Sequence, residues 1–310
     1  MNIPKVTTVI GAGSMGPGIA ALLSRSGSQV RLHDVSEEAL VRAEDVCAGA
    51  TKHLDELDVP VTPGGSISFE REQSTALAGT EFVIEAVPEK IDLKKTVLRE
   101  IEAAVGDEVI IATNTSGIPI SDMAVSMAKP ERFIGMHWSN PPHLIPMIEV
   151  IRGDLTTEDV ETRLVAIVRA FGYEAVVEKE VPGFIENRVL YAIMRECLSL
   201  IEEGVATRED LDTCVKWGIG YKLSVIGPMR LLDMAGLDIY QSVASYLNRD
   251  LSTAQDVPAL IAEMTSQGRL GMKAGDGLYS YGDGEVAAKR ADIVAGLIRA
   301  RKALSEIKPV

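Results

Sequence analysis

The sequence predicts an α/β fold in which a doubly wound, mainly parallel sheet is followed by a smaller, all-helical domain. Three observations lead to this prediction. A β-branched run near the start passes through a glycine-rich turn into a helix, and further strand-like runs then alternate with helical sequence. After about residue 182 the apolar residues take helical spacing, and no series of strands returns. We therefore expect one domain over residues 1–182 and a second over residues 183–310.

The first elements form a βαβ unit around a glycine motif. Val6–Ile10 is the first strand, residues 11–16 read Gly-Ala-Gly-Ser-Met-Gly, and the helix that follows ends near Gly27. A second strand, Gln29–His33, leads to Asp34, which follows Gly16 by 18 residues. A strand before the motif, a helix after it and an acid at this distance are the context in which G-x-G-x-x-G indicates a Rossmann-type, dinucleotide-binding fold.

Each part of this motif has a role in binding a dinucleotide. The glycines permit a tight turn, let backbone N–H groups approach a pyrophosphate at the helix N-terminus, and let the helix pack closely on the strand. Asp34 can accept hydrogen bonds from ribose hydroxyls, and no Arg follows it immediately, which favours NAD over NADP. We expect an NAD-binding domain. The alternative is a glycine-rich turn that binds no ligand.

The remaining elements follow from the apolar pattern. A long apolar-striped helix is predicted over Asn187–Glu203, and a polar-faced helix over Glu285–Glu306 ends the second domain. The later strands of the sheet are predicted at Phe82–Ala86, Val109–Ala112, Phe133–Met136 and Met147–Ile151.

Composition excludes several classes of protein. The 310 residues carry a formal net charge of −14 and no Lys/Arg-rich run, which argues against nucleic acid. The three cysteines are far apart and form no disulfide or metal-binding pattern, so we expect a cytoplasmic protein without a metal. The charge-free stretch Val6–Ser24 contains four glycines and Pro17, so we expect no membrane span there. The expected partner is a small-molecule substrate.

His137 is the histidine best placed for chemistry. His33 precedes Asp34 and His53 lies in a polar helix, so we interpret both as bystanders. His137 ends a predicted strand at the carboxyl edge of the sheet, where open α/β folds bind ligands. Glu149, twelve residues later, lies in an apolar strand, where an inward carboxylate needs a partner. A His–Glu pair would act as a general base. Glu149 could equally face solvent on an edge strand.

Two polar segments are further candidates, each with an ordinary structural explanation. Asn114-Thr-Ser116 follows a predicted strand at its carboxyl edge, where its side chains could reach the nicotinamide or a substrate oxygen, but the triplet is also a turn signal. Asn187 follows Val181-Pro-Gly-Phe184 and could simply be a polar residue at a helix start.

Together these motifs resemble the L-3-hydroxyacyl-CoA dehydrogenase family over essentially the whole chain. The resemblance implies a catalytic set of Ser116, His137, Glu149 and Asn187, and it favours the His–Glu pair over the solvent-facing alternative. The matching segments are residues 11–20, 85–89 with Lys94, 114–116, 137–141, 182–188 and 226–238. The cofactor positions expected from the motif and the resemblance are Gly11, Gly13, Ser14, Met15, Gly16, Asp34, Val87, Glu89, Lys94 and Asn114.

The sequence departs from the acyl-CoA members in ways that affect the substrate. The segment Ser36–Asp58 has seven acids against one Arg and one Lys, where those members carry lysines for the CoA phosphates. The sequence around His137 and over residues 210–221 is similar to that of a vitamin B6-degrading branch of the family, which oxidises an aromatic aldehyde to an acid with NAD. The candidate substrate residues on this reading are Trp138, His143, Lys222 and Arg230.

The leading expectation is an NAD-dependent oxidoreductase acting on a small carboxylated, aromatic aldehyde or alcohol. The alternatives are a 3-hydroxyacyl-CoA or hydroxy-acid dehydrogenase, an imine or keto-acid reductase on the same scaffold, and a non-catalytic NAD-binding protein like the lens crystallins of this superfamily. Because family members pair through the helical half, and the stripe on Asn187–Glu203 exceeds what one small domain covers, we expect a homodimer.

Overall fold

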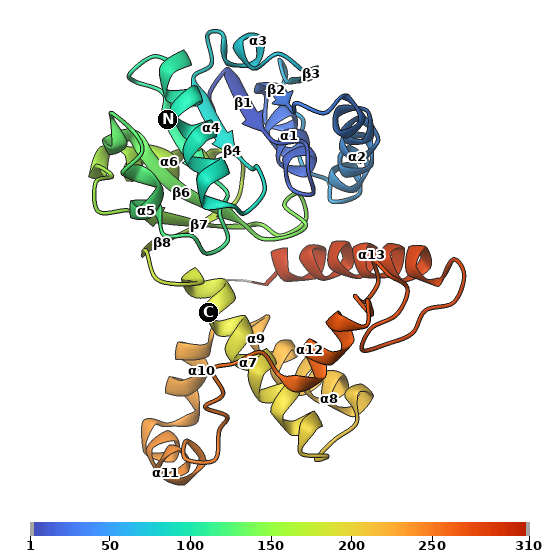
Figure 1. The fold of residues 1–310 in the computed structure, drawn as a ribbon. Helices are drawn as coiled ribbons and strands as arrows, with labels where there is room; N and C mark the ends of the chain where they lie inside the picture. Colours follow the sequence, from blue (N-terminus) through green and yellow to red (C-terminus); the bar gives the residue numbers. More distant parts are fainter. Residues whose placement is uncertain (1–2, 308–310) are drawn as a thin grey trace. The chain divides into compact units, whose positions relative to one another are not determined.

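The structure, a computed structural model, describes residues 3–307 and divides after Arg188 into two compact units. The division falls a few residues beyond residue 182 because the start of helix α7 (Phe184–Glu202) packs in the first unit. Each unit is built around elements of a different kind (Figure 1).

The first unit is built on an eight-stranded sheet with the order β3-β2-β1-β4-β5-β6-β7-β8. Neighbouring strands are parallel except for β6 and β7, which are antiparallel. The predicted α/β, doubly wound sheet is thus confirmed. The strands are β1 (Val6–Ile10), β2 (Gln29–His33), β3 (Ser66–Glu70), β4 (Phe82–Glu85), β5 (Ile110–Thr113), β6 (Phe133–Trp138), β7 (Met147–Arg152) and β8 (Glu174–Lys179).

Two strands and one strand end differ from the sequence-based expectation. The edge strands β3 and β8 were not predicted, because both are rich in polar residues and only partly buried. Strand β6 continues to Trp138, so His137 lies within the strand rather than at its end. His137 is therefore held within the sheet by its pairing with β7, where Glu149 lies opposite it.

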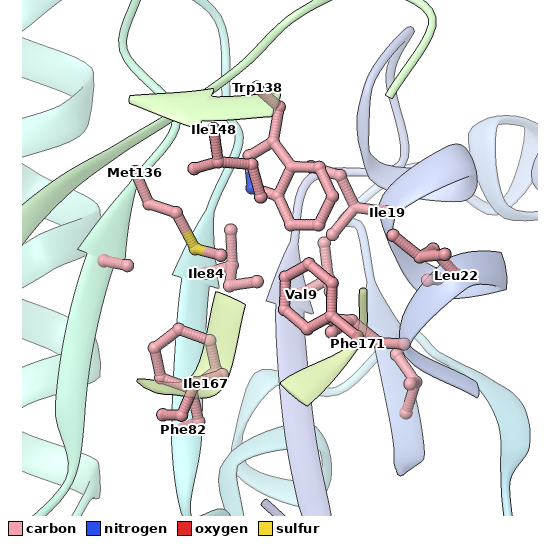
Figure 2. Close-up of a cluster of buried hydrophobic side chains, with 14 of the residues drawn as sticks. Val9, Ile19, Leu22, Phe82, Ile84, Met136, Trp138, Ile148, Ile167 and Phe171 are labelled. Atoms are coloured by element: carbon pink, nitrogen blue, oxygen red, sulfur yellow. The ribbon is translucent and has the colours of Figure 1, made fainter. Parts of the chain in front are cut away.

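Helices cover both faces of the sheet and form two apolar cores. One core lies between the sheet and helices α1, α2 and α6, and the other lies between the sheet and α3, α4, α5 and the start of α7. Figure 2 shows part of the first core, where Ile19, Ile148 and Phe171 surround Trp138. The helices are α1 (Gly16–Arg25), α2 (Glu37–Glu56), α3 (Gln73–Leu77), α4 (Ile91–Ala104), α5 (Ile120–Ala124) and α6 (Glu158–Ala170).

The second unit is helical, as predicted, and no strand longer than an isolated bridge occurs among its described residues, 189–307. Beyond the rest of α7, its helices are α8 (Arg208–Cys214), a π-helical turn (Val215–Gly220), α9 (Tyr221–Leu223), α10 (Pro228–Ala235), α11 (Leu237–Leu247), α12 (Ala259–Ser266) and α13 (Glu285–Ser305). Within residues 3–307, no helix has the length and apolar character needed to cross a bilayer.

Candidate active site

The glycine-rich turn joins β1 to α1 in the geometry that a dinucleotide needs. Gly11 has a positive φ of 113°, and a Cβ there would lie 2.5 Å from the carbonyl oxygen of Ala86. At Gly16, where α1 begins, a Cβ would lie 1.9 Å from the Gly11 carbonyl oxygen. Gly13 has no atom within 4 Å of such a position. The first and third glycines thus shape the turn, while the second leaves its backbone open to a pyrophosphate.

Asp34 lies beside this turn at the end of β2. Its Oδ2 accepts a hydrogen bond from the Ala12 N–H at 2.9 Å, and its Oδ1 accepts one from the Ser36 N–H at 2.9 Å. The carboxylate is therefore fixed next to the exposed residues Gly13 and Ser14, as a ribose-binding acid should be. These residues fit NAD, and the preference for NAD over NADP stays a prediction.

Lys94 does not line the cofactor site, and that interpretation was wrong. Its side chain on α4 is fully buried, and its Nζ donates to both carboxylate oxygens of Glu85, at 2.8 and 3.1 Å. Glu85 also accepts from the Val87 N–H at 2.7 Å and from the Thr113 hydroxyl at 2.6 Å. Lys94 therefore neutralises a buried carboxylate beneath the loop that follows β4. A charge there would be costly without it.

Glu89 links this loop to the loop that follows β5. Its Oε1 accepts from the Thr115 hydroxyl at 2.6 Å and from the Ser116 N–H at 2.8 Å, and its Oε2 lies 3.3 Å from Lys94 Nζ. Burial acts to raise the pKa of Glu89, but the Thr115 hydrogen bond and the Lys94 charge outweigh it and lower the pKa. Glu89 thus fixes Ser116.

His137 and Glu149 form the predicted pair across β6 and β7. The antiparallel register places them directly opposite each other, and His137 Nδ1 lies 2.6 Å from Glu149 Oε2, with both side chains buried. The other oxygen of Glu149 accepts from the Glu186 N–H at 2.7 Å. The ring of Phe184 packs 5.7 Å from the imidazole. The pair is therefore rigid, and Nε2 is the nitrogen left for proton transfer.

The charge of Glu149 is maintained by its hydrogen bonds. Burial acts to raise its pKa, but the hydrogen bonds from His137, from the Glu186 backbone and from Glu178 outweigh burial and lower the pKa. An ionised Glu149 accepts the Nδ1 proton of His137, which sets the tautomer that leaves Nε2 able to accept a proton. The arrangement suits a general base.

Ser116 and Asn187 are also brought together. The Asn187 side chain donates from Nδ2 to the Ser116 carbonyl oxygen at 3.0 Å. Asn187 is adjacent in sequence to Glu186, whose side chain accepts a hydrogen bond from the Ser139 hydroxyl. The start of α7 therefore contacts both Glu149 of the predicted pair and the loop that carries Ser116. Glu186 and Glu178 were not among the predicted site residues, although Glu186 lies inside the family-like segment 182–188.

Two of the candidate substrate residues have other roles. Trp138 is only 1% exposed and stacks on Phe171, with ring centroids 5.6 Å apart, so it is a core residue and cannot face a substrate (Figure 2). The backbone N–H of Trp138 donates to the side-chain oxygen Oδ1 of Asn114 at 2.9 Å, and the cofactor role of Asn114 stays a prediction. His143 is buried against His53, with 3.0 Å between their ring nitrogens.

The other assignments remain open. Lys222 lies on α9 and Arg230 on α10, both exposed in the second unit, and their roles stay predictions. Among the described residues, one group of metal-ligand type comprises His137, Glu149 and Glu186, whose donor atoms lie within 4.8 Å of one another. The hydrogen bonds described above already engage both oxygens of Glu149, so we interpret the group as a hydrogen-bonded cluster.

Comparisons with known proteins agree along the whole chain. A family model described as "3-hydroxyacyl-CoA dehydrogenase, NAD binding domain" matches residues 6–181, and its C-terminal domain counterpart matches residues 183–281. The chain is 48% identical to the 5-formyl-3-hydroxy-2-methylpyridine 4-carboxylate 5-dehydrogenase of Mesorhizobium japonicum, over 96% of this chain and 97% of that protein. It is 34% identical to a probable 3-hydroxybutyryl-CoA dehydrogenase of Deinococcus radiodurans, over 88% of this chain and 99% of that protein.

Solved structures show the same similarity. A crystal structure of a 5-formyl-3-hydroxy-2-methylpyridine 4-carboxylic acid 5-dehydrogenase, described as an NAD+-dependent dismutase, superposes with a TM-score of 0.96 at 46% identity, covering 99% of this chain and 100% of that one. The (S)-3-hydroxybutyryl-CoA dehydrogenase of Ralstonia eutropha gives a TM-score of 0.71 at 32% identity, covering 90% and 99% of the two chains.

Proposed function

The chain belongs to the 3-hydroxyacyl-CoA dehydrogenase family of NAD-dependent dehydrogenases, and on that premise we propose that it oxidises a small aromatic aldehyde bearing a carboxylate to the acid. The observation that carries the proposal is the buried His137–Glu149 pair in a chain that aligns almost end to end with the Mesorhizobium japonicum aldehyde-acid dehydrogenase. The 3-hydroxybutyryl-CoA dehydrogenases share the family but align at lower identity.

The residues supply the proton chemistry of this reaction. When bound, NAD accepts the hydride. Nε2 of His137 takes the hydroxyl proton of the hydrated aldehyde, and Glu149 stabilises the imidazolium that results. Ser116 and Asn187, joined by their hydrogen bond, are placed to hold the substrate oxygen. His137 can serve an aldehyde hydrate or a secondary alcohol in the same way, so the pocket rather than the pair decides the substrate.

The charge of α2 argues against a CoA thioester. All seven acids of Ser36–Asp58 are exposed, and the segment follows Asp34 directly, beside the cofactor turn. CoA brings several phosphate charges, and exposed charges repel over a Debye length of about 8–10 Å at physiological salt. The segment has only one Arg and one Lys, too few to offset its seven negative charges. We infer that a compact substrate without phosphates is favoured.

The first expected result concerns substrate class. We expect kcat/KM for 5-formyl-3-hydroxy-2-methylpyridine 4-carboxylate with NAD to exceed that for acetoacetyl-CoA with NADH by about tenfold or more, since each 1.4 kcal/mol of lost binding costs a factor of about ten. NADH absorbance on one preparation measures both. A CoA substrate that equals or exceeds the aldehyde-acid would contradict the proposal and favour the 3-hydroxyacyl-CoA alternative.

The assembly that we propose is a homodimer formed through the second unit. Within the described part of that unit only Met264 and Ile298 are buried apolar residues, whereas large apolar side chains are exposed on most of its helices. Soluble monomers rarely expose large apolar patches, so a partner surface is expected to cover these side chains. The exposed set includes Tyr191, Trp217, Tyr221, Met229, Met234 and Ile239. We also propose a cytoplasmic location, since all three cysteines are free thiols.

Light scattering tests the dimer. We expect the wild-type protein to have twice the chain mass at micromolar concentration, and Met229→Asp with Met234→Asp to shift it towards the monomer, because both residues are at least 70% exposed in the apolar surface. The matched control is Val125→Asp, which changes a 72% exposed residue in the first unit and should leave the mass unchanged. A wild-type monomer would contradict the proposal.

A further inference from the structure

A second glutamate lies behind the His137–Glu149 pair. Strand β8 runs parallel to β7, and Glu149 lies opposite Val176, so Glu178 is the next residue along that face of β8. His137 lies opposite Glu149 on the other side. Three neighbouring strands therefore present a histidine and two glutamates in a row on the α5 face of the sheet. Both oxygens of Glu178 are buried there, and the charge of Glu149 acts on them.

Among the described residues, Glu178 has no Lys or Arg partner that would balance a negative charge. Both of its oxygens are shut off from solvent. The titratable groups on its face of the sheet and on the helices packed there are His137 on β6, Glu149 on β7, Glu186 on α7, the exposed Asp122 on α5, and Glu180, which accepts from the Ser121 N–H of α5. Two buried carboxylates in contact repel strongly, so such a pair shares one proton.

The hydrogen bonds decide which glutamate holds that proton. Glu149 accepts from both His137 Nδ1 and the Glu186 N–H, which stabilise its charged form. Burial, the charge of Glu149 and the hydrogen bond between the two raise the pKa of Glu178 to about 8, and the Ile185 N–H opposes this rise with a smaller effect. At neutral pH the acid is therefore Glu178 and the carboxylate is Glu149.

We propose that Glu178 is a positioning residue that stays protonated and donates a hydrogen bond to Glu149, so that a neutral acid, a carboxylate and an imidazole form one chain. The inference rests on the proposed role of His137 as general base. The neutral acid holds Glu149 against the imidazole without adding charge. When Glu178 ionises, this bond is lost and a second negative charge faces the pair. Glu149 is then no longer held in place against the imidazole, so the oxidation slows.

The experiment measures kcat/KM as a function of pH for the wild-type enzyme and for Glu178→Gln, with 5-formyl-3-hydroxy-2-methylpyridine 4-carboxylate and NAD as substrates. The Gln amide is neutral at every pH and can still donate to Glu149. We expect the two enzymes to agree within about threefold at pH 7, and the ratio of wild-type to variant kcat/KM to fall about tenfold per pH unit above the raised pKa of about 8, the slope of a single ionisation. The ratio cancels ionisations of the substrate and cofactor.

The matched control is Glu174→Gln, which removes the same charge from an exposed position on the same strand and face. Its ratio to wild type should not change with pH. Glu178→Met, which has similar length but no donor, should lose activity at all pH values and show no step near pH 8. A Glu178→Gln ratio that stays constant with pH would overturn the proposal.

The stability of the fold at different pH values tests the protonation of Glu178 without relying on enzyme activity. A carboxyl whose pKa is raised in the folded state contributes stability that is present at low pH and is lost as the pH rises from about 4.5 to about 8. The denaturant midpoint of wild type relative to Glu178→Gln should fall across that range, and equal midpoints throughout would contradict protonation. If His137→Ala retained turnover while this shift was seen, the proposed function would fail and the protonation of Glu178 would stand.

Discussion

Replacement of His137 by Ala is expected to lower turnover by about 10²–10⁴-fold, the usual contribution of a positioned general base, while NADH binding stays nearly unchanged. The reason is the separation of the two sites in the first unit. His137 on β6 contacts Glu149 and Phe184, whereas the glycine turn and Asp34 lie at β1 and β2, on the other side of β4 and β5. Steady-state NADH formation measures turnover, and NADH fluorescence measures binding.

A second variant of the pair and a matched control complete this experiment. Glu149→Gln should also lose most activity while remaining folded, because an amide can donate to Nδ1 and favour the wrong imidazole tautomer. His53→Gln is the matched control, since His53 on α2 contacts His143 and not His137. If the His137 variant retained most of its turnover, the base would have to be another residue.

Replacement of Lys94 by Met is expected to destabilise the fold by about 3–5 kcal/mol, the cost of leaving a buried charge without its partner. The Lys94 and Glu85 side chains are both fully buried, and Glu85 would keep only the Val87 N–H and Thr113 hydroxyl as donors. Because Lys94 also pairs with Glu89, the loop that carries Ser116 should become more mobile. Urea unfolding followed by circular dichroism measures the change.

Two further variants separate charge burial from loss of the helix side chain. Lys95→Met on the same helix removes a partly exposed lysine with no described ion pair and should change stability by less than about 1 kcal/mol. Adding Glu85→Gln to Lys94→Met removes the orphaned charge and should recover part of the loss. Equal effects of Lys94→Met and Lys95→Met would show that the buried pair does not stabilise this unit.

The fold could be predicted from the sequence where its signals are local. The first strand, the glycine turn and the first helix lie within a few residues of one another, so apolar periodicity and the motif identify them together. Strands β3 and β8 lie at the edges of the sheet. Their side chains on both faces are partly or fully exposed, so the alternation of apolar and polar residues that marks a strand is lost. The direction of β7 also depends on tertiary pairing.

The site was predictable only in part, for a related reason. His137 and Glu149 were identified because buried polar residues in apolar strands need partners, but their contact depends on a register that the sequence does not contain. Trp138 follows His137 and so points to the opposite face of the sheet, into the core, as strand alternation requires. The family resemblance places Lys94 at the cofactor, whereas in the structure the lysine is buried against the carboxylate of Glu85, a pairing that the sequence alone does not reveal.

The fate of the formyl hydrogen shows whether the reaction is a hydride transfer assisted by His137. With enzyme in excess over aldehyde-acid deuterated at the formyl carbon, we expect one deuterium per acid formed to appear on the nicotinamide ring of NADH, detected by mass spectrometry. The wild-type enzyme should do this in a single turnover, and His137→Ala should form about 10²–10⁴-fold less labelled NADH in the same time. Acid formation with the deuterium lost to solvent, or equal labelling by the two enzymes, would contradict hydride transfer assisted by His137.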